Sequence, residues 1–88
     1  MDPYRVLIPK KAAKLLEVLP LDILRLVYAR MQLLAANPRP QWAKPLKGAP
    51  PGWRFRVSDY RVLYDIDDGD RVVTIRGAGH RRDVYRQR

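Results

Sequence analysis

The sequence predicts an α+β domain of the order βααβββ, with two helices packed on one face of a small, mainly antiparallel sheet. Residues 53–57 alternate between apolar and polar side chains, which is typical of a strand with one buried and one solvated face. Residues 10–19 and 21–36 instead carry apolar side chains at helical spacing. At 88 residues, the chain has room for one domain, spanning 1–88, with a single two-layer core.

The first half of the chain forms a strand followed by a helical hairpin. Residues 4–8 are aromatic and β-branched, which favours a strand, and Pro9 suits the first turn of the helix that follows. Pro20 separates the two helices. Five of the eight prolines lie in residues 37–52, so we expect a rigid crossing loop there, with Leu46 as its anchor in the core.

The second half contains three strands joined by tight turns. We expect strands at residues 53–57, 60–66 and 71–77, with an Asp-Gly turn before the last of them. A terminal bend over Gly77, Gly79 and residues 81–85 follows. The helix-facing side should then carry Trp53, Phe55, Val57, Val62, Tyr64, Ile66, Val73 and Ile75.

Composition narrows the functional classes. The net charge is +9, and every basic residue after position 52 except the single histidine is an arginine, which indicates an anionic partner. The chain has no cysteine, which rules out disulfides and thiolate metal sites. One histidine without a ligand cluster predicts no metal, and we expect no cofactor. Without a long apolar run or a signal-peptide core, we expect a cytoplasmic protein with no membrane association.

Arginines gather on the solvated side of the predicted sheet. Arg54 and Arg56 alternate with the buried residues of one strand, Arg61 begins the next strand, and Arg76 is placed on the same face. Guanidinium groups lined up on an open face repel one another unless an anion lies among them, and they match the geometry of phosphates. The alternative is that each arginine pairs with an acid such as Asp59, Asp65 or Asp83.

Three motifs together resemble the RelE/ParE toxins of bacterial and archaeal toxin–antitoxin pairs. They are Lys-Pro-Leu-Lys-Gly at 44–48, Trp-Arg-Phe-Arg-Val-Ser-Asp-Tyr-Arg-Val-Leu-Tyr at 53–64, and Gly-His-Arg-Arg-Asp-Val-Tyr at 79–85. The resemblance implies a RelE-like toxin that cleaves mRNA in the ribosomal A site through attack by the ribose 2′-hydroxyl. It also implies three partners: the ribosome, mRNA and an acidic, partly helical RelB-like antitoxin.

The resemblance carries functional roles onto particular positions. The matching positions are Arg54, Arg56, Arg61, one basic position among His80, Arg81 and Arg82, and Tyr85. We therefore expect catalytic roles for Arg54, Arg56, Arg61, His80, Arg81 and Tyr85, and we add RNA contacts at Lys44, Lys47, Arg76 and Arg82. Well-known members have a lysine where Arg56 stands, and arginine is a poor proton acceptor. Either Arg56 is purely electrostatic or another base acts, and His80 has the side chain whose ordinary pKa suits proton transfer near neutrality.

Several alternatives remain open from the sequence. A ParE-type toxin would inhibit DNA gyrase without nuclease activity, and a nucleic-acid-binding module would have neither activity. His80 could be a polar loop residue, and Tyr85 could pack on the sheet rather than contact RNA. Trp42 could pack or meet a partner. The acids of residues 67–70 are expected at a solvated hairpin tip rather than at a metal site.

Overall fold

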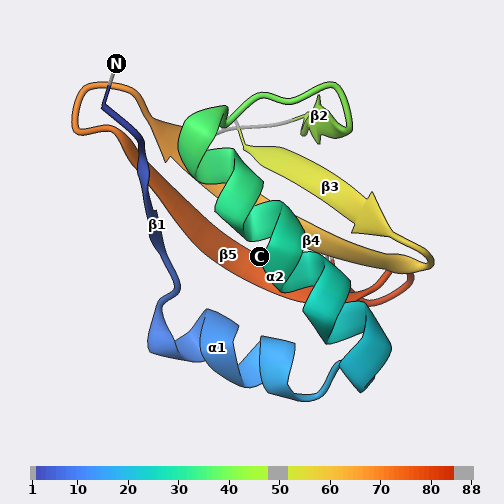
Figure 1. The fold of residues 1–88 in the computed structure, drawn as a ribbon. Helices are drawn as coiled ribbons and strands as arrows, with labels where there is room; N and C mark the ends of the chain where they lie inside the picture. Colours follow the sequence, from blue (N-terminus) through green and yellow to red (C-terminus); the bar gives the residue numbers. More distant parts are fainter. Residues whose placement is uncertain (1, 48–51, 85–88) are drawn as a thin grey trace.

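The computed structural model describes residues 2–47 and 52–84, and it has the predicted α+β architecture. Its elements are β1 (Arg5–Leu7), α1 (Lys10–Glu17), α2 (Leu21–Ala36), β2 (Ala43–Pro45), β3 (Trp53–Val57), β4 (Tyr60–Asp67) and β5 (Val72–His80). The strands form one sheet in the order β1-β5-β4-β3-β2. β1 runs parallel to β5, and the other neighbours are antiparallel. Figure 1 shows α2 lying across the sheet, with α1 at the far end of β1.

Both helices begin directly after a proline. Pro9 and Pro20 occupy the N-cap positions of α1 and α2, where a backbone N–H is not needed for the helix. α2 has the predicted bounds, whereas α1 ends at Glu17 and its last turn closes with the Leu19 N–H on the Leu16 carbonyl at 3.1 Å. Within the described residues, neither helix is long and apolar enough to cross a bilayer.

The core lies between the two helices and one face of the sheet, as the alternation of apolar residues predicts. Its helical members include Leu16, Val27, Met31 and Leu34, and its strand members include Phe55, Val57, Val62, Tyr64, Val73 and Ile75. Trp53 and Ile66 pack at its margin, so the predicted helix-facing set is confirmed.

The hydroxyl group of Tyr64 ties the core to the proline-rich segment. It donates a hydrogen bond to the Pro38 carbonyl at 2.8 Å, and burial raises the pKa of Tyr64 above its ordinary value. The buried phenol is therefore neutral at physiological pH, and its hydrogen bond fixes where the chain leaves α2.

Two differences from the predicted strands are larger than one residue at a strand end. Residues 43–45 were expected to be loop but form β2, because they pair with residues 53–55 of β3 at the edge of the sheet. Pro45 is the last residue of β2, and an edge strand tolerates proline because its N–H is not needed by a further neighbour.

The expected terminal bend at Gly77 is also wrong. β5 continues to His80 because β4 offers pairing partners as far as Tyr60. The register shifts at Leu63/Tyr64, where Tyr64 faces Ile75 but Leu63 faces Gly77. Sequence patterning gives no sign of this bulge, since glycine in an alternating segment favours a strand end and a bulge equally.

The β4–β5 turn is fastened to the rest of the fold. Asp68 accepts hydrogen bonds from the Tyr4 hydroxyl at 2.5 Å and from Arg39 at 3.1 and 2.8 Å. The hydrogen bond from Arg39 is the main cause that lowers the pKa of Asp68 to about 2. Asp68 therefore acts as a structural acceptor that joins the β4–β5 turn to Tyr4 and Arg39. Among the described residues no group of acids or histidines could hold a metal ion.

This contact predicts a pH-dependent contribution to stability. Asp68→Asn should lower the melting temperature at neutral pH, but only slightly, because the Arg39 and Asp68 side chains are 43% and 56% exposed. The wild-type advantage is complete above the ordinary pKa of 3.8 and declines as pH falls toward about 2, because Asp68 then becomes protonated. Thermal melts between neutral pH and pH 2 check this.

Asp70→Asn is the matched control, since the Asp70 carboxylate forms no ion pair within residues 2–47 and 52–84. An Asp68→Asn deficit of equal size at every pH would contradict the role assigned to the carboxylate.

Candidate nucleic-acid interface

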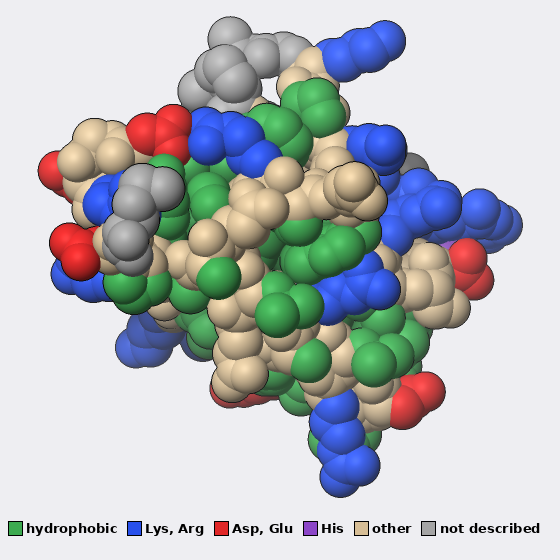
Figure 2. Space-filling model, turned by 45° about the horizontal axis from the view of Figure 1, so that its top comes forward, with side chains coloured by type: hydrophobic (Ala, Val, Ile, Leu, Met, Phe, Trp, Pro, Cys, Tyr) green, Lys and Arg blue, Asp and Glu red, His purple; other side chains and the backbone are tan. Residues whose placement is uncertain are grey.

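Like charges stand opposite each other twice on the sheet face turned away from the helices. Lys44 of β2 pairs with Arg54 of β3, and Arg56 of β3 pairs with Arg61 of β4. We call these four residues the basic face. Directly opposite side chains lie close together, so each like-charge pair destabilises the sheet. Figure 2 shows Lys and Arg side chains gathered on the side of the molecule where β3 and the β3–β4 turn lie in Figure 1.

Two nitrogens of the Arg61 guanidinium have no hydrogen-bond partner. Its Nε and Nη1 atoms are buried and form no hydrogen bond. Leaving a buried polar group unpaired costs about 1–3 kcal/mol, and more when the group is charged. An arginine kept in this state beside Arg56 is unfavourable for folding, and a bound anion would satisfy both side chains.

Arg76 lies on the side of the sheet turned away from the helices, as predicted, but it is ion-paired and we do not count it in the basic face. It lies at the β5 bulge, between Ile75, which faces Tyr64, and Gly77, which faces Leu63. Its Nε donates to the Asp65 carboxylate at 2.5 Å, so the ion-pair alternative holds for this arginine. The described residues contain one other ion pair, Arg39–Asp68. No acid in the described part of the chain therefore neutralises the basic face.

The end of β5 brings further basic residues to the β3–β4 turn. The Arg81 N–H donates to the Asp59 carbonyl at 2.7 Å, which places the turn after β5 beside the turn after β3. Arg81 and Arg82 are exposed there. The predicted site residue Tyr85 lies outside the described residues.

His80 is oriented by two contacts. Its ring meets that of Tyr60 edge to face, with centroids 5.6 Å apart, and its Nδ1 accepts the Arg82 N–H at 3.3 Å. The register pairs His80 with Tyr60, whose ring packs against the core, so His80 lies on the other side of the strand pair from Arg61. Sequence reasoning grouped His80 with the arginines, but the structure brings them only to the same end of the sheet.

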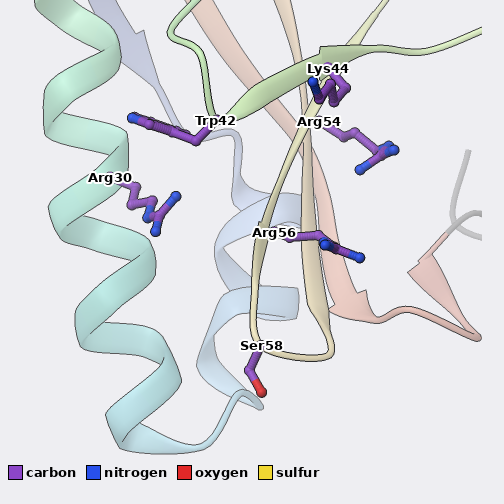
Figure 3. A pocket seen from close by; sticks show the side chains of 6 residues that line it. All are labelled: Arg30, Trp42, Lys44, Arg54, Arg56 and Ser58. Carbon is purple, nitrogen blue, oxygen red and sulfur yellow. The ribbon is translucent and has the colours of Figure 1, made fainter.

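A groove of about 560 Å³ runs along the free edge of β3. It is lined by Arg30, Trp42, Lys44, Arg54, Arg56 and Ser58, without an acidic residue. Figure 3 shows Arg30 extending from α2 on one side of β3, while Arg54 and Arg56 extend on the other side. The predicted Lys47 is exposed just beyond β2 and does not line the groove.

Arg30 is the member of this groove that sequence reasoning missed. Its guanidinium carbon lies 4.9 Å from the centroid of the Trp42 ring, and that ring meets Phe55 edge to face at 5.4 Å. A signal was present in the sequence, since Val27, Arg30 and Leu34 lie at helical spacing along one line of α2. Trp42 therefore packs on the core and also holds a cation.

Comparison with known proteins assigns the family. The model of the ParE toxin of the type II toxin–antitoxin system parDE matches residues 6–85. The chain belongs to the RelE/ParE toxin family. It is 31% identical over 86 residues to the protein assigned as toxin RelE1 in Methanocaldococcus jannaschii, covering 94% of this chain and 96% of that protein. The chain is thus a toxin of a RelBE/ParE-type system, as the motifs indicate.

Solved structures agree with the sequence relationship. The toxin–antitoxin complex RelBE2 of Mycobacterium tuberculosis contains a chain with 32% identity and a TM-score of 0.77, covering 89% of this chain and 98% of that one. The RelE–RelB complex of Pyrococcus horikoshii contains one with 31% identity and a TM-score of 0.79, covering 90% and 96%. The fold prediction is therefore confirmed at the level of the family.

The unpaired state of Arg61 predicts that the toxin can be stabilised at that position. Arg61→Met keeps a long side chain but removes the buried charge and its repulsion with Arg56, so the free energy of unfolding should rise by about 1–3 kcal/mol. Urea denaturation measures the change. Arg76→Met is the control, because it breaks the pair with Asp65 and should leave stability unchanged or lower. A destabilised Arg61→Met protein would contradict this account of the basic face.

Proposed function

We propose that this toxin is a ribosome-dependent endoribonuclease that cleaves mRNA in the ribosomal A site. The observation that carries the proposal is the basic face, in which Lys44 opposes Arg54 and Arg56 opposes Arg61 without a neutralising acid in the described residues. This arrangement lowers stability and is compensated by a bound polyanion. An RNA backbone supplies one phosphate per nucleotide along such a face.

The chemistry of RNA cleavage makes use of unpaired arginines. The ribose 2′-oxygen attacks the adjacent phosphorus while the bond to the 5′-oxygen breaks, which leaves a 2′,3′-cyclic phosphate and a free 5′-hydroxyl. Negative charge increases on the non-bridging oxygens in the transition state, and donors already aimed at that position stabilise it. Arg61 suits this role because two nitrogens of its guanidinium are buried without a hydrogen-bond partner, and Arg54 and Arg56 extend the same field.

One proton must leave the 2′-hydroxyl and one must reach the 5′-oxygen. His80 remains our candidate, because neither Arg56 nor the buried Tyr64 releases or accepts a proton near neutral pH. In the observed arrangement Nδ1 accepts the Arg82 N–H, so the neutral ring carries its proton on Nε2. For transfer, a proton from solvent at Nδ1 would replace the Arg82 bond, and the resulting imidazolium would donate from Nε2 to the 5′-oxygen while the 2′-hydroxyl proton passes to water. Because His80 and Arg61 lie on opposite sides of the β4–β5 pair, the reacting phosphate would have to lie at the end of that pair.

We further propose an acidic, RelB-like antitoxin as the partner of the free toxin. The M. tuberculosis and P. horikoshii relatives were both solved in complex with their RelB chains. A chain of opposite charge would relieve the repulsion on the basic face and exclude RNA from it. The complex should therefore be inert, and release of the toxin should restore activity.

Inhibition of DNA gyrase is the second candidate, because the matching family model is that of ParE toxins. Primer extension on a defined mRNA in a purified translation system tests the first candidate. We expect cuts confined to the codon in the A site. Intact mRNA, together with loss of supercoiling in a parallel gyrase assay using the same antitoxin-free protein, would overturn the proposal in favour of the second.

The role of His80 predicts a change in the pH dependence of cleavage. If His80 transfers a proton, the single-turnover rate changes with pH through this imidazole, and His80→Asn flattens that profile and lowers the rate by roughly 10²–10⁴-fold. If His80 only holds the turn through Nδ1, asparagine can accept the same Arg82 N–H and the profile keeps its shape. Rates measured from pH 5.5 to 8.5 separate the two roles.

A further inference from the structure

Basic residues extend beyond the sheet face to the helical side of the molecule. β2 pairs with β3 only as far as Phe55, so the β3 edge from Arg56 to Ser58 has no strand beside it in the described part of the chain. The groove that opens there connects the basic face with α2. Arg30 contributes a cation from that side.

Arg30 is held in position rather than free in solvent. Its guanidinium carbon lies 4.9 Å from the centroid of the Trp42 ring. The Trp42 ring is itself held in place because it packs edge to face on Phe55. A stacked guanidinium keeps its N–H donors at its rim available, and it loses less conformational entropy when it binds a phosphate. Arg30 forms no ion pair within the described residues.

We infer that this groove, which we call the edge groove, binds the backbone of single-stranded RNA, with Arg30 contacting a phosphate on the α2 side and Lys44 and Arg54 contacting a neighbouring phosphate on the basic face. The RNA strand passes around the β3 edge, with one phosphate on the basic face and a neighbouring phosphate on the α2 side. The inference rests on the proposed RNA substrate but adds a contact away from the reacting atoms. Arg30 is a binding residue, and Trp42 is the residue that positions it.

Binding to a non-cleavable RNA tests the edge groove separately from cleavage. Fluorescence anisotropy with a 2′-O-methyl oligonucleotide gives the dissociation constant as a function of KCl concentration. Arg30→Ala should raise the dissociation constant about tenfold and reduce the slope of log K against log salt by about 0.7, the value for one lost phosphate contact on a single strand.

Arg25→Ala is the matched control. Arg25 is an exposed arginine on the same helix that does not line the groove, so its loss removes the same charge. Arg25→Ala should leave the dissociation constant and the salt slope near their wild-type values. Arg30→Lys keeps the charge but not the guanidinium over the Trp42 ring, and we expect an intermediate loss.

Trp42 fluorescence tests whether RNA binds in the edge groove. The chain has two tryptophans, so Trp53→Phe leaves Trp42 as the single indole. RNA should change the Trp42 emission in the Trp53→Phe protein at the same concentration at which anisotropy saturates, and Arg30→Ala should weaken that response in parallel.

Equal changes in the dissociation constant and in the salt slope for Arg30→Ala and Arg25→Ala would overturn the inference, because RNA binding would then depend only on net charge. Competition by polyglutamate as strong as by RNA, with the same dependence on Arg30, would also overturn it and assign the groove to an acidic peptide. Neither result bears on A-site cleavage, which primer extension measures independently. Conversely, absence of cleavage would leave the RNA-binding result standing.

Discussion

The repulsion between cations on the basic face is the constraint on which the rest of the structure depends. Two like-charge pairs, Lys44–Arg54 and Arg56–Arg61, occupy adjacent rows of the same sheet face. Each such pair costs up to about 1 kcal/mol relative to neutral residues. A small domain tolerates this cost only if its other face is well packed, and here the helices bury Phe55, Tyr64 and their neighbours completely.

The ion pairs lie at one end of β4. Asp65 pairs with Arg76 and Asp68 pairs with Arg39 near the β4–β5 turn, whereas Asp59 and Asp83, at the other end, form no ion pair within the described residues. The opposite end, around the β3–β4 turn, collects the unpaired cations, and the turn after β5 adds Arg81 to it. Ion pairs thus stabilise one end of the fold, while the other end is left available to an anionic ligand.

The sequence predicts which face of the sheet is buried better than it predicts the edge strand and the strand ends. Strict alternation in residues 53–57 determined which side is buried, and the proline positions located both helices within two residues. β2 could not be predicted, because three residues of a proline-rich segment become a strand only when β3 lies beside them. The pairing of Arg76 with Asp65 depends on a bulge that no periodicity reveals.

The sequence predicts the candidate site as a set of basic residues. The structure arranges basic residues on two connected surfaces, the basic face and the edge groove. One face of the sheet carries Arg54, Arg56 and Arg61, as predicted, because successive side chains of a strand point to opposite faces. His80 was placed less well, because a bend was expected after Gly77, whereas β5 continues to His80 and pairs it with Tyr60. Arg30 was not predicted as a site residue. It lies on α2 beside the apolar residues that predict the helix, and only those residues entered the prediction.

The central claim is that unsatisfied arginines on the basic face carry the chemistry. The most direct test is the single-turnover rate of A-site cleavage by Arg61→Met compared with Arg76→Met on purified ribosomes. We expect the Arg61 variant to be slower by about 10²–10³-fold, as for the loss of one transition-state donor, and the ion-paired Arg76 variant to remain close to wild type. A wild-type rate for Arg61→Met, or equal losses in both variants, would contradict the claim.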